Sequence, residues 1–368
     1  MMMGIPVDDL EPILWGLSGV LGAVVGSFLN VCIYRIPIEG LHVTSPRGSF
    51  CPSCKSAVRF FDNIPVLAWL WLRGRCRDCS EPISPRYPLV EALSAALFLL
   101  VAYRFGGEIL GADPLVPEQV ELAQILLLVG VWGWVSILIV VSGIDFDHKI
   151  IPDSISIPAT AAVLLVSPWN PGLPVMETRE SMTLVDACGG GLPLVLSLLI
   201  GAVVLGGGFQ RWMPNWEGQR RTVAECYLFY LLGALIGILA AAYLFGSGAT
   251  GSFSIARIQS SLIGAGTGAG VIWGVGKIGS MVFRKPAMGF GDVKWMGLLG
   301  ATLGPIPILF AFLLACLLGS IVGIWLRLRR GASYIPFGPF LSAGALSMLL
   351  GRPQLQWIWE RYLGLLQG

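Results

Sequence analysis

Long apolar stretches dominate the pattern of hydrophobic and polar positions along this chain. A helix needs about 20 mostly apolar residues to cross a membrane, and uncharged windows of that order recur throughout. They cover 12–34, 122–144, 154–176, 187–210, 226–256, 258–276, 295–326 and 331–351, with a weaker candidate over 88–103 that contains Glu91. The pattern therefore predicts an all-α protein with many membrane-spanning helices.

The window 295–326 is too long for one span and contains Gly304-Pro305. A proline inside a helix removes an intrahelical hydrogen bond, so we expect two short helices that meet at this dipeptide. With 88–103 counted as a span, the chain is predicted to have about ten membrane helices.

Composition agrees with this prediction. Of the 368 residues, 55% are hydrophobic and only 12% are charged, and the mean hydropathy is +0.76. Ordinary soluble domains carry ~25% charged residues, so a soluble fold could not cover its surface with so few. A polytopic membrane protein is the class that remains, and the net charge of +2 gives no reason to expect nucleic acid as a partner.

Basic residues orient the predicted spans. Ten spans place 19 of the 24 lysines and arginines on one side of the membrane, many of them in the polar segment 35–87. Basic loops face the cytoplasm, so we expect 35–87 and 209–225 to be cytoplasmic and 168–186 to lie outside. Acidic residues precede the first window, so it is expected to remain a membrane helix and not to be cleaved as a signal peptide.

Four of the eight cysteines form two Cys-x-x-Cys pairs, separated by 21 residues: Cys51, Cys54, Cys76 and Cys79. Two such pairs close a tetrahedral site that suits Zn²⁺, and four thiolates make the site structural. Disulfides are the alternative, disfavoured on the reducing side of a membrane. Trp69 and Trp71 are expected to pack on this small fold. The other cysteines are interpreted as small core residues: Cys32, Cys188, Cys226 and Cys316.

Carboxylates at the predicted cytoplasmic ends of spans are the candidate catalytic groups, because ionisable groups in a membrane are costly and usually functional. Asp145 closes the third span and Asp292 opens the eighth. If the two met across the bundle, repulsion would make them share a proton, so that one acts as general base on a water and the other as general acid. Gly289 and Gly291 beside Asp292 would admit a substrate backbone.

Each acid also has a plainer interpretation. Asp153 follows Pro152 at a predicted helix start, where a carboxylate is favoured by the helix dipole. Asp147 could be solvated or paired with Lys149, and Asp292 could be an N-cap. The residues alone therefore leave the dyad as one interpretation among several.

A set of motifs in fixed order makes the chain resemble the bacterial prepilin peptidases. After the first window, which ends Gly26-Ser-Phe-Leu-Asn-Val-Cys-Ile-Tyr-Arg-Ile-Pro37, come the two cysteine pairs and Pro85-Arg-Tyr-Pro-Leu-Val-Glu91. Ile144-Asp145 to Pro152-Asp153, Met288-Gly-Phe-Gly-Asp-Val-Lys294 and Ile335-Pro-Phe-Gly-Pro339 follow. Gly-x-Gly-Asp alone is a weak motif, whereas the ordered set is specific.

This resemblance implies an intramembrane aspartic protease of the GxGD type in the bacterial inner membrane, with Asp145 and Asp292 as catalytic residues. Supporting residues would be Gly289, Gly291, Asp147, Asp153 and Lys294. Such enzymes remove the basic leader of type IV prepilins or type II secretion pseudopilins, typically after Gly, and methylate the new N-terminus with S-adenosylmethionine. The cofactor is implied by the resemblance only. We expect the basic leader to lie near the acids Asp62, Asp78 and Glu81.

Two features depart from the family pattern. The two aspartates are separated by 146 residues, and the excess lies in an insertion over 168–258 with two extra spans, 187–210 and 226–246. Pro286 stands where the family commonly has Glu. The predicted layout is a first helix, a zinc domain, a membrane core with the first aspartate, the insertion, a core with the GxGD motif and a tail: 12–34, 35–87, 88–167, 168–258, 259–351 and 352–368.

Two other classes fit parts of the pattern. A transporter is expected to have charged groups near the bilayer midplane and internal repeats. The acids of this chain instead cluster at one predicted edge of the membrane. A non-catalytic zinc-bearing membrane scaffold for pilus or secretion assembly would keep the cysteines and need neither aspartate.

Overall fold

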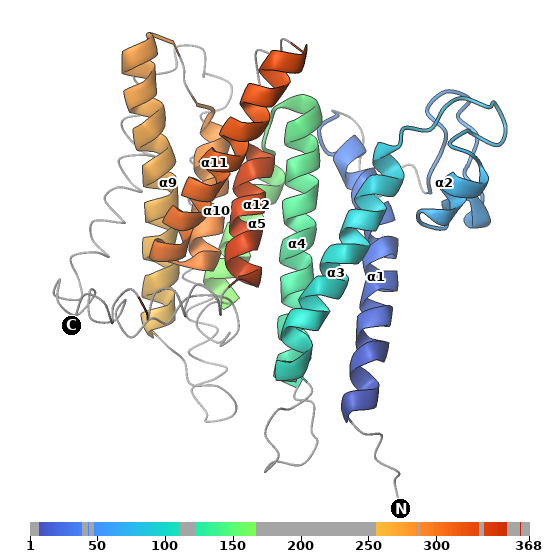
Figure 1. Ribbon diagram of the computed structural model, residues 1–368, viewed down its shortest axis with the longest axis horizontal. Helices are drawn as coiled ribbons and strands as arrows, with labels where there is room; N and C mark the ends of the chain where they lie inside the picture. Colours follow the sequence, from blue (N-terminus) through green and yellow to red (C-terminus); the bar gives the residue numbers. More distant parts are fainter. Residues whose placement is uncertain are drawn as a thin grey trace, which may run out of the picture. The chain divides into compact units, whose positions relative to one another are not determined.

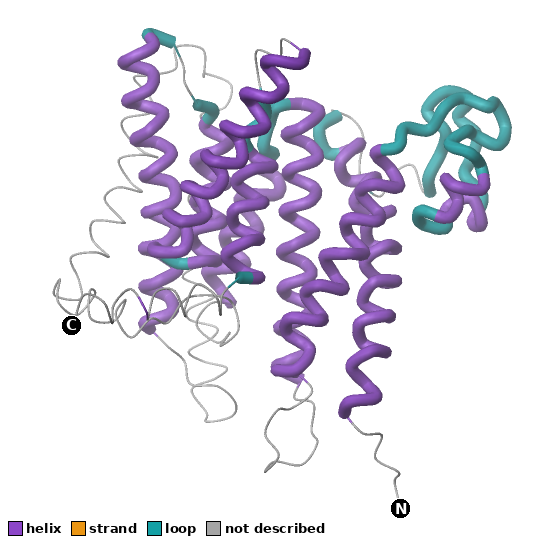
Figure 2. Tube along the Cα trace, viewed as in Figure 1, coloured by secondary structure: helices purple, strands orange, loops and turns teal. Residues whose placement is uncertain are grey.

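The computed structural model describes residues 7–38, 43, 48–109, 122–166, 255–285, 288–330, 335–351 and 361. These residues form helices joined by loops (Figure 2). They belong to two compact units, Met1–Lys149 and Ile150–Gly368, which are described separately.

The first unit contains three long helices and a small non-membrane segment between the first two (Figure 1). The long helices are α1 (Val7–Arg35), α3 (Arg86–Ile109) and α4 (Leu122–His148). The segment between α1 and α3 has the short helices η1 (Phe60–Asn63) and α2 (Leu67–Trp71).

Glycines bring α1 and α3 into close contact. A Cβ added at Gly22 would lie 2.6 Å from the Ser94 carbonyl oxygen, and one at Gly26 would lie 2.8 Å from Glu91 Cα. Small residues four positions apart let membrane helices approach in this way. α4 joins the pair through Phe98 and Trp132, whose rings stack with centroids 5.3 Å apart.

In the second unit, α10 packs against its four neighbours. Its helices are α5 (Asp153–Val166), α9 (Ile255–Phe283), α10 (Phe290–Leu303), α11 (Pro305–Arg330) and α12 (Gly338–Leu350). Trp295 of α10 is fully buried, and its indole N–H donates to Ser342 Oγ at 3.3 Å. A Cβ added at Gly264 of α9 would lie 2.1 Å from the Gly300 carbonyl oxygen, so the α9–α10 contact also depends on glycine.

The predicted break at Gly304-Pro305 is confirmed. α10 ends at Leu303, and α11 begins at Pro305. Gly304 between them has φ +86°, a left-handed conformation that residues with a Cβ rarely adopt. The weaker candidate 88–103 is also helical, because it lies inside α3.

Four helices of the described part are long and apolar enough to cross a membrane: Glu11–Arg35, Arg86–Phe105, Leu128–His148 and Pro305–Arg329. The protein is therefore a multi-pass membrane protein.

Three helices are too short to cross a membrane. α5, α10 and α12 have 14, 14 and 13 residues, which at ~1.5 Å per residue makes each helix shorter than the ~30 Å hydrocarbon core. The total of ten spans stays a prediction. Several features lie outside the described residues: the window 187–210, all of the window 226–256 except its last two residues, the loops 168–186 and 209–225, Cys188, Cys226, Pro286 and most of the tail 352–368.

Candidate functional site

Asp145 is a buried carboxylate near the end of a membrane helix. It lies in the last turn of α4 and is only 4% exposed. This part of α4 packs closely on α1, because a Cβ added at Gly143 would lie 2.6 Å from Ile33 Cδ1. A buried ionisable side chain at this position is expensive, which marks it as a candidate functional group.

Asp147, two residues further on, has a different environment. Its carboxylate is ion-paired with the guanidinium of Arg86, at the start of α3. The sequence had suggested Lys149 as the partner or full solvation, so the pairing with Arg86 was missed. Arg86 belongs to the Pro85–Glu91 motif. The motif identified this segment as important, but it did not predict that Arg86 pairs with Asp147.

Asp292 lies in the first turn of α10, after the N-cap residue Gly289. A Cβ added at Gly289 would lie 3.4 Å from Asp292 Oδ2, so the carboxylate turns back toward the start of the helix. One added at Gly291 would lie 3.1 Å from Ile151 Cβ. Gly291 therefore allows the first turn of α10 to pack closely against Ile151, which precedes α5.

Asp153 and Lys294 form an ion pair within the second unit. Lys294 Nζ lies 2.5 Å and 2.7 Å from the two carboxylate oxygens of Asp153. Asp153 is the first residue of α5, as expected of an acid that favours a helix N-terminus. The pair joins α5 to α10 only two residues from Asp292. Asp145 and Asp292 belong to different units, so their meeting as a dyad stays a prediction.

The four predicted metal ligands come together. The sulfur atoms of Cys51, Cys54, Cys76 and Cys79 all lie within 4.8 Å of one another, and Cys51 Sγ is 3.8 Å from Cys79 Sγ. Tetrahedral Zn–S bonds of ~2.3 Å place sulfur atoms ~3.8 Å apart. The cluster therefore has the composition and spacing of a site that could bind zinc.

Two equivalent turns build this cluster. In the first, Lys55 N–H donates to the Cys51 carbonyl and Cys51 N–H to the Ser56 carbonyl, both at 2.9 Å. The second repeats these contacts 25 residues later, with Ser80 N–H to Cys76 at 2.9 Å and Cys76 N–H to Glu81 at 2.8 Å. Lys55 and Ser80 both have φ near +60°, so the same backbone shape presents each cysteine pair.

Local hydrogen bonding prepares Cys54 for metal binding. Its sulfur lies 3.3 Å from Ser56 Oγ, and stabilisation of the thiolate by the Ser56 side chain and backbone lowers the pKa of Cys54 to about 6. At Cys79 the Glu81 backbone also favours the thiolate, but desolvation and the neighbouring cysteines outweigh it and raise the pKa to about 12. Four thiolates this close need a cation to offset their repulsion.

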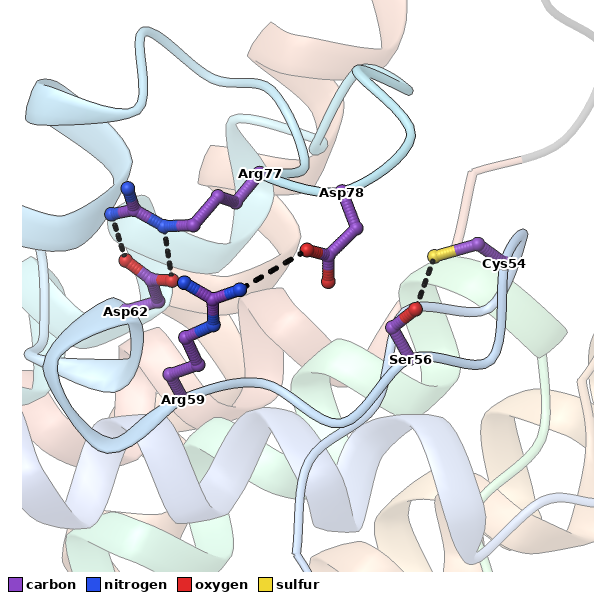
Figure 3. Close-up of polar contacts among 6 residues, drawn as sticks. All are labelled: Cys54, Ser56, Arg59, Asp62, Arg77 and Asp78. Atoms are coloured by element: carbon purple, nitrogen blue, oxygen red, sulfur yellow. Dashed lines mark hydrogen bonds and ion pairs between the residues drawn. The ribbon is translucent and has the colours of Figure 1, made fainter.

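Ion pairs connect the second turn to η1 (Figure 3). Arg77 holds both carboxylate oxygens of Asp62 at 2.7 and 2.5 Å, and Arg59 lies 3.6 Å from Asp78. The hydrogen bond from Arg77 lowers the pKa of the Asp62 carboxyl. Asp62 and Asp78 were expected to lie near a basic leader, but each already has an arginine partner within the chain.

The two tryptophans differ. Trp69 packs on the small fold as expected, because its indole N–H donates to the Ile83 carbonyl at 3.0 Å and its ring covers Gly74. Trp71 is 47% exposed, but its side chain also contacts the small fold, because it hydrogen bonds to the Asp62 carboxylate and helps to lower the pKa of that group. Cys32 and Cys316 lie outside the cysteine cluster; Cys32 is buried and Cys316 partly buried.

Comparison with known proteins agrees with these features. Residues 20–105 match the bacterial peptidase A24 N-terminal domain, and residues 219–324 match the type IV leader peptidase family. The first range contains the cysteine cluster and the second contains Asp292, whereas Asp145 falls between them.

Whole-length relatives point the same way. A protein named prepilin leader peptidase/N-methyltransferase from Stutzerimonas stutzeri is 30% identical over 94% of this chain and 95% of its own length. Proteins of the same name from Aeromonas hydrophila, 29% identical over 95% of both chains, and Klebsiella pneumoniae, 36% identical over 54% of this chain and 81% of its own, also match. No solved structure matches significantly. The chain belongs to the type IV leader peptidase family.

Proposed function

We propose that this protein is a membrane-embedded aspartic endopeptidase that removes the basic leader of type IV prepilins or type II secretion pseudopilins, typically after Gly. Membership of the peptidase family and the names of its whole-length relatives support this activity. A transporter or an inert scaffold is not favoured, since neither accounts for this match.

The catalytic pair in this proposal is Asp145 and Asp292. The observation that carries it is the burial of Asp145, which is 4% exposed at the end of a membrane helix. Asp292 lies in the first turn of α10, where Gly291 permits close packing against Ile151. Asp147 and Asp153 form ion pairs with Arg86 and Lys294, which gives both acids a structural role.

Hydrolysis by such a pair needs one carboxyl protonated and one ionised. The carboxylate removes a proton from a water that attacks the scissile carbonyl, while the carboxylic acid protonates the carbonyl oxygen. Protonation of the leaving amine then completes the cleavage. The space beside Gly291 is filled by Ile151, 3.1 Å from a Cβ added there, so the absence of a side chain at Gly291 serves helix packing and not the admission of substrate.

Three further features belong to the proposal. The segment 35–87 and the active site face the cytoplasm, as the distribution of basic residues favours. The cysteine cluster holds one structural Zn²⁺. The new N-terminus is then methylated with S-adenosylmethionine, as the relatives' names suggest.

Substitution of each aspartate tests the catalytic assignment. Asp145→Asn and Asp292→Asn should each abolish leader cleavage by protein reconstituted in lipid, because an amide cannot take part in the proton exchange. Asp153→Asn is the matched control and should retain partial activity. Near-normal cleavage by the Asp292→Asn protein, with a prepilin as substrate, would refute the assignment.

A further inference from the structure

The last turn of α4 combines features that are unfavourable on their own. It contains two carboxylates, Asp145 and Asp147, although the negative end of the helix dipole disfavours acids at a helix C-terminus. Lys149, just beyond the helix, has φ +59°, a left-handed conformation that residues with a Cβ rarely adopt. Its N–H caps the Asp145 carbonyl at 2.9 Å. A turn of this kind depends on contacts from outside its own helix, and such local strain often accompanies function.

Arg86 supplies one of these contacts, through its ion pair with Asp147. α3 and α4 run antiparallel, so the start of α3 and the end of α4 lie at the same end of the unit (Figure 1). Arg86 is the first residue of α3, where a cation is disfavoured by its own helix dipole. Both charges therefore lie at the unfavourable end of their own helix, and each is compensated by the other. Tertiary packing, and not helix stability, accounts for this pair.

The start of α3 is itself held in place. Ser84 Oγ accepts a hydrogen bond from the Arg86 N–H at 3.3 Å, and Asn30 Nδ2 of α1 donates to the Tyr87 carbonyl at 3.0 Å. The Arg86 guanidinium also lies over the Tyr87 ring, 5.9 Å from its centroid. Arg86 Nε is buried and has no hydrogen-bond partner in the part of the chain that the structure describes. Since a buried N–H without a partner is unfavourable, the side chain is retained for its contact with Asp147.

The pair acts on Asp145 through the backbone of α4. Successive residues of an α-helix are rotated by ~100°, so Asp145 and Asp147 project in nearly opposite directions. Asp145 is buried, while Asp147 meets Arg86. Gly143 packs the same part of α4 against α1, so the two contacts together restrict shifts and rotations of this turn. Such restriction matters because a misplacement of ~1 Å at a reacting group can lower a rate by ~100-fold.

The second unit repeats this arrangement. Asp292 lies in the first turn of α10, two residues before Lys294, whose ion pair with Asp153 reaches the start of α5. Asp145 likewise lies two residues before Asp147, whose ion pair reaches the start of α3. Each aspartate of the proposed catalytic pair therefore has an ion pair between helix ends as its near neighbour.

We propose that Arg86 is a positioning residue of the leader peptidase reaction: its ion pair with Asp147 fixes the last turn of α4, and with it the carboxyl of Asp145. The proposal rests on the proposed catalytic role of Asp145. It assigns Arg86 an effect on the rate of the chemical step and little effect on substrate affinity.

Steady-state cleavage of one prepilin by the full-length protein in lipid separates kcat from KM. Arg86→Met removes the charge at similar length and should lower kcat by about tenfold or more, while KM stays within about twofold of wild type. Asp147→Asn, an isosteric change, should do the same. The double variant should be no slower than the slower single variant, since both changes remove the same contact. Arg86→Lys keeps the charge and should retain kcat within about threefold.

Arg104→Met is the matched control. Arg104 lies further along the same helix, against the ring of Phe105, and its loss should leave kcat within about twofold of wild type. Thermal unfolding of each variant separates positioning from loss of fold. Ion pairs as accessible to water as the Arg86–Asp147 pair contribute little to stability, so the unfolding temperatures should stay near that of wild type. If Arg86→Met proves unstable, Asp147→Asn decides the result.

Wild-type kcat in Arg86→Met and Asp147→Asn, or a change confined to KM, would overturn the positioning role. Losses that add in the double variant would also overturn it, as would an Arg86→Lys protein no faster than Arg86→Met. In each case, leader cleavage by wild type and its absence in Asp145→Asn would keep the proposed function intact. Cleavage by the Asp145→Asn protein would instead refute the catalytic assignment, and the positioning role with it.

Discussion

Lys294 holds both carboxylate oxygens of Asp153, at 2.5 and 2.7 Å, two residues along α10 from Asp292. The lysine side chain is 17% exposed and the aspartate side chain 47%. Pairs this accessible to water contribute only ~0–1 kcal/mol to stability. The contact therefore contributes little to stability, and its main effect is to fix the position of the first turn of α10 against α5.

Disruption of this pair should slow cleavage without abolishing it. Lys294→Met and Asp153→Asn should each lower the initial rate by about three- to tenfold, equivalent to ~0.6–1.4 kcal/mol of barrier. Since both changes remove the same contact, the double variant should be no slower than the slower single variant. Rates measured on one prepilin would show this, and losses that add in the double variant would indicate independent roles.

The activity of a carboxyl pair should depend on pH as a bell. Hydrolysis needs one proton shared between Asp145 and Asp292, so activity falls when both are protonated and again when both are ionised. Initial cleavage rates between pH 4 and pH 10, on protein shown to remain folded at each pH, would measure the two limbs. A rate that rises steadily over this range would argue against a shared proton.

Zinc should be bound at one ion per chain. Cys51→Ser should lower the zinc content and destabilise the segment between α1 and α3, because metal binding to these thiolates contributes to folding. Cys316→Ser, outside the cluster, should keep its zinc. Elemental analysis of freshly purified, reduced protein provides the measurement, and absence of zinc would contradict this prediction. Chelators should not inhibit cleavage directly, since four thiolates close the site to substrate.

Apolar patterning predicted much of the helical architecture. Every window in the described part falls on a helix, and the break at Gly304-Pro305 occurs where proline chemistry requires it. The cysteine cluster also followed from spacing alone, because two Cys-x-x-Cys turns restrict where their sulfurs can lie. These features depend on local chemistry, which a sequence displays directly.

Contacts between distant residues were harder to foresee. Arg86 pairs with Asp147, 61 residues away, and Lys294 with Asp153, 141 residues away. Several basic residues in the sequence could pair equally well with each of these acids, and only the packing of the helices decides which of them does. Arg59 and Arg77 likewise neutralise acids that had been assigned to the substrate leader. The unsatisfied oxygen of Asn30 is visible only once α1, α3 and the intervening segment pack together.

The glycines of α1 provide a test of helix packing in the membrane. A Cβ added at Gly22 would meet backbone and Cβ atoms of α3 at 2.6–2.9 Å, whereas one added at Gly16 would meet nothing within 4 Å. Both substitutions to alanine change the same helix by one methyl group. Any general effect of alanine on helix stability is therefore shared, and the difference between the two variants isolates the contact with α3.

Gly22→Ala should destabilise the protein by ~1–3 kcal/mol relative to Gly16→Ala, as expected for overpacking against atoms that cannot move aside. At ~25 °C this corresponds to a roughly 5- to 150-fold change in the unfolding equilibrium. Reversible denaturation in mixed detergent micelles, followed by the fluorescence of the membrane tryptophans, would measure the difference. Equal stability of the two variants would mean that α1 and α3 do not pack through Gly22.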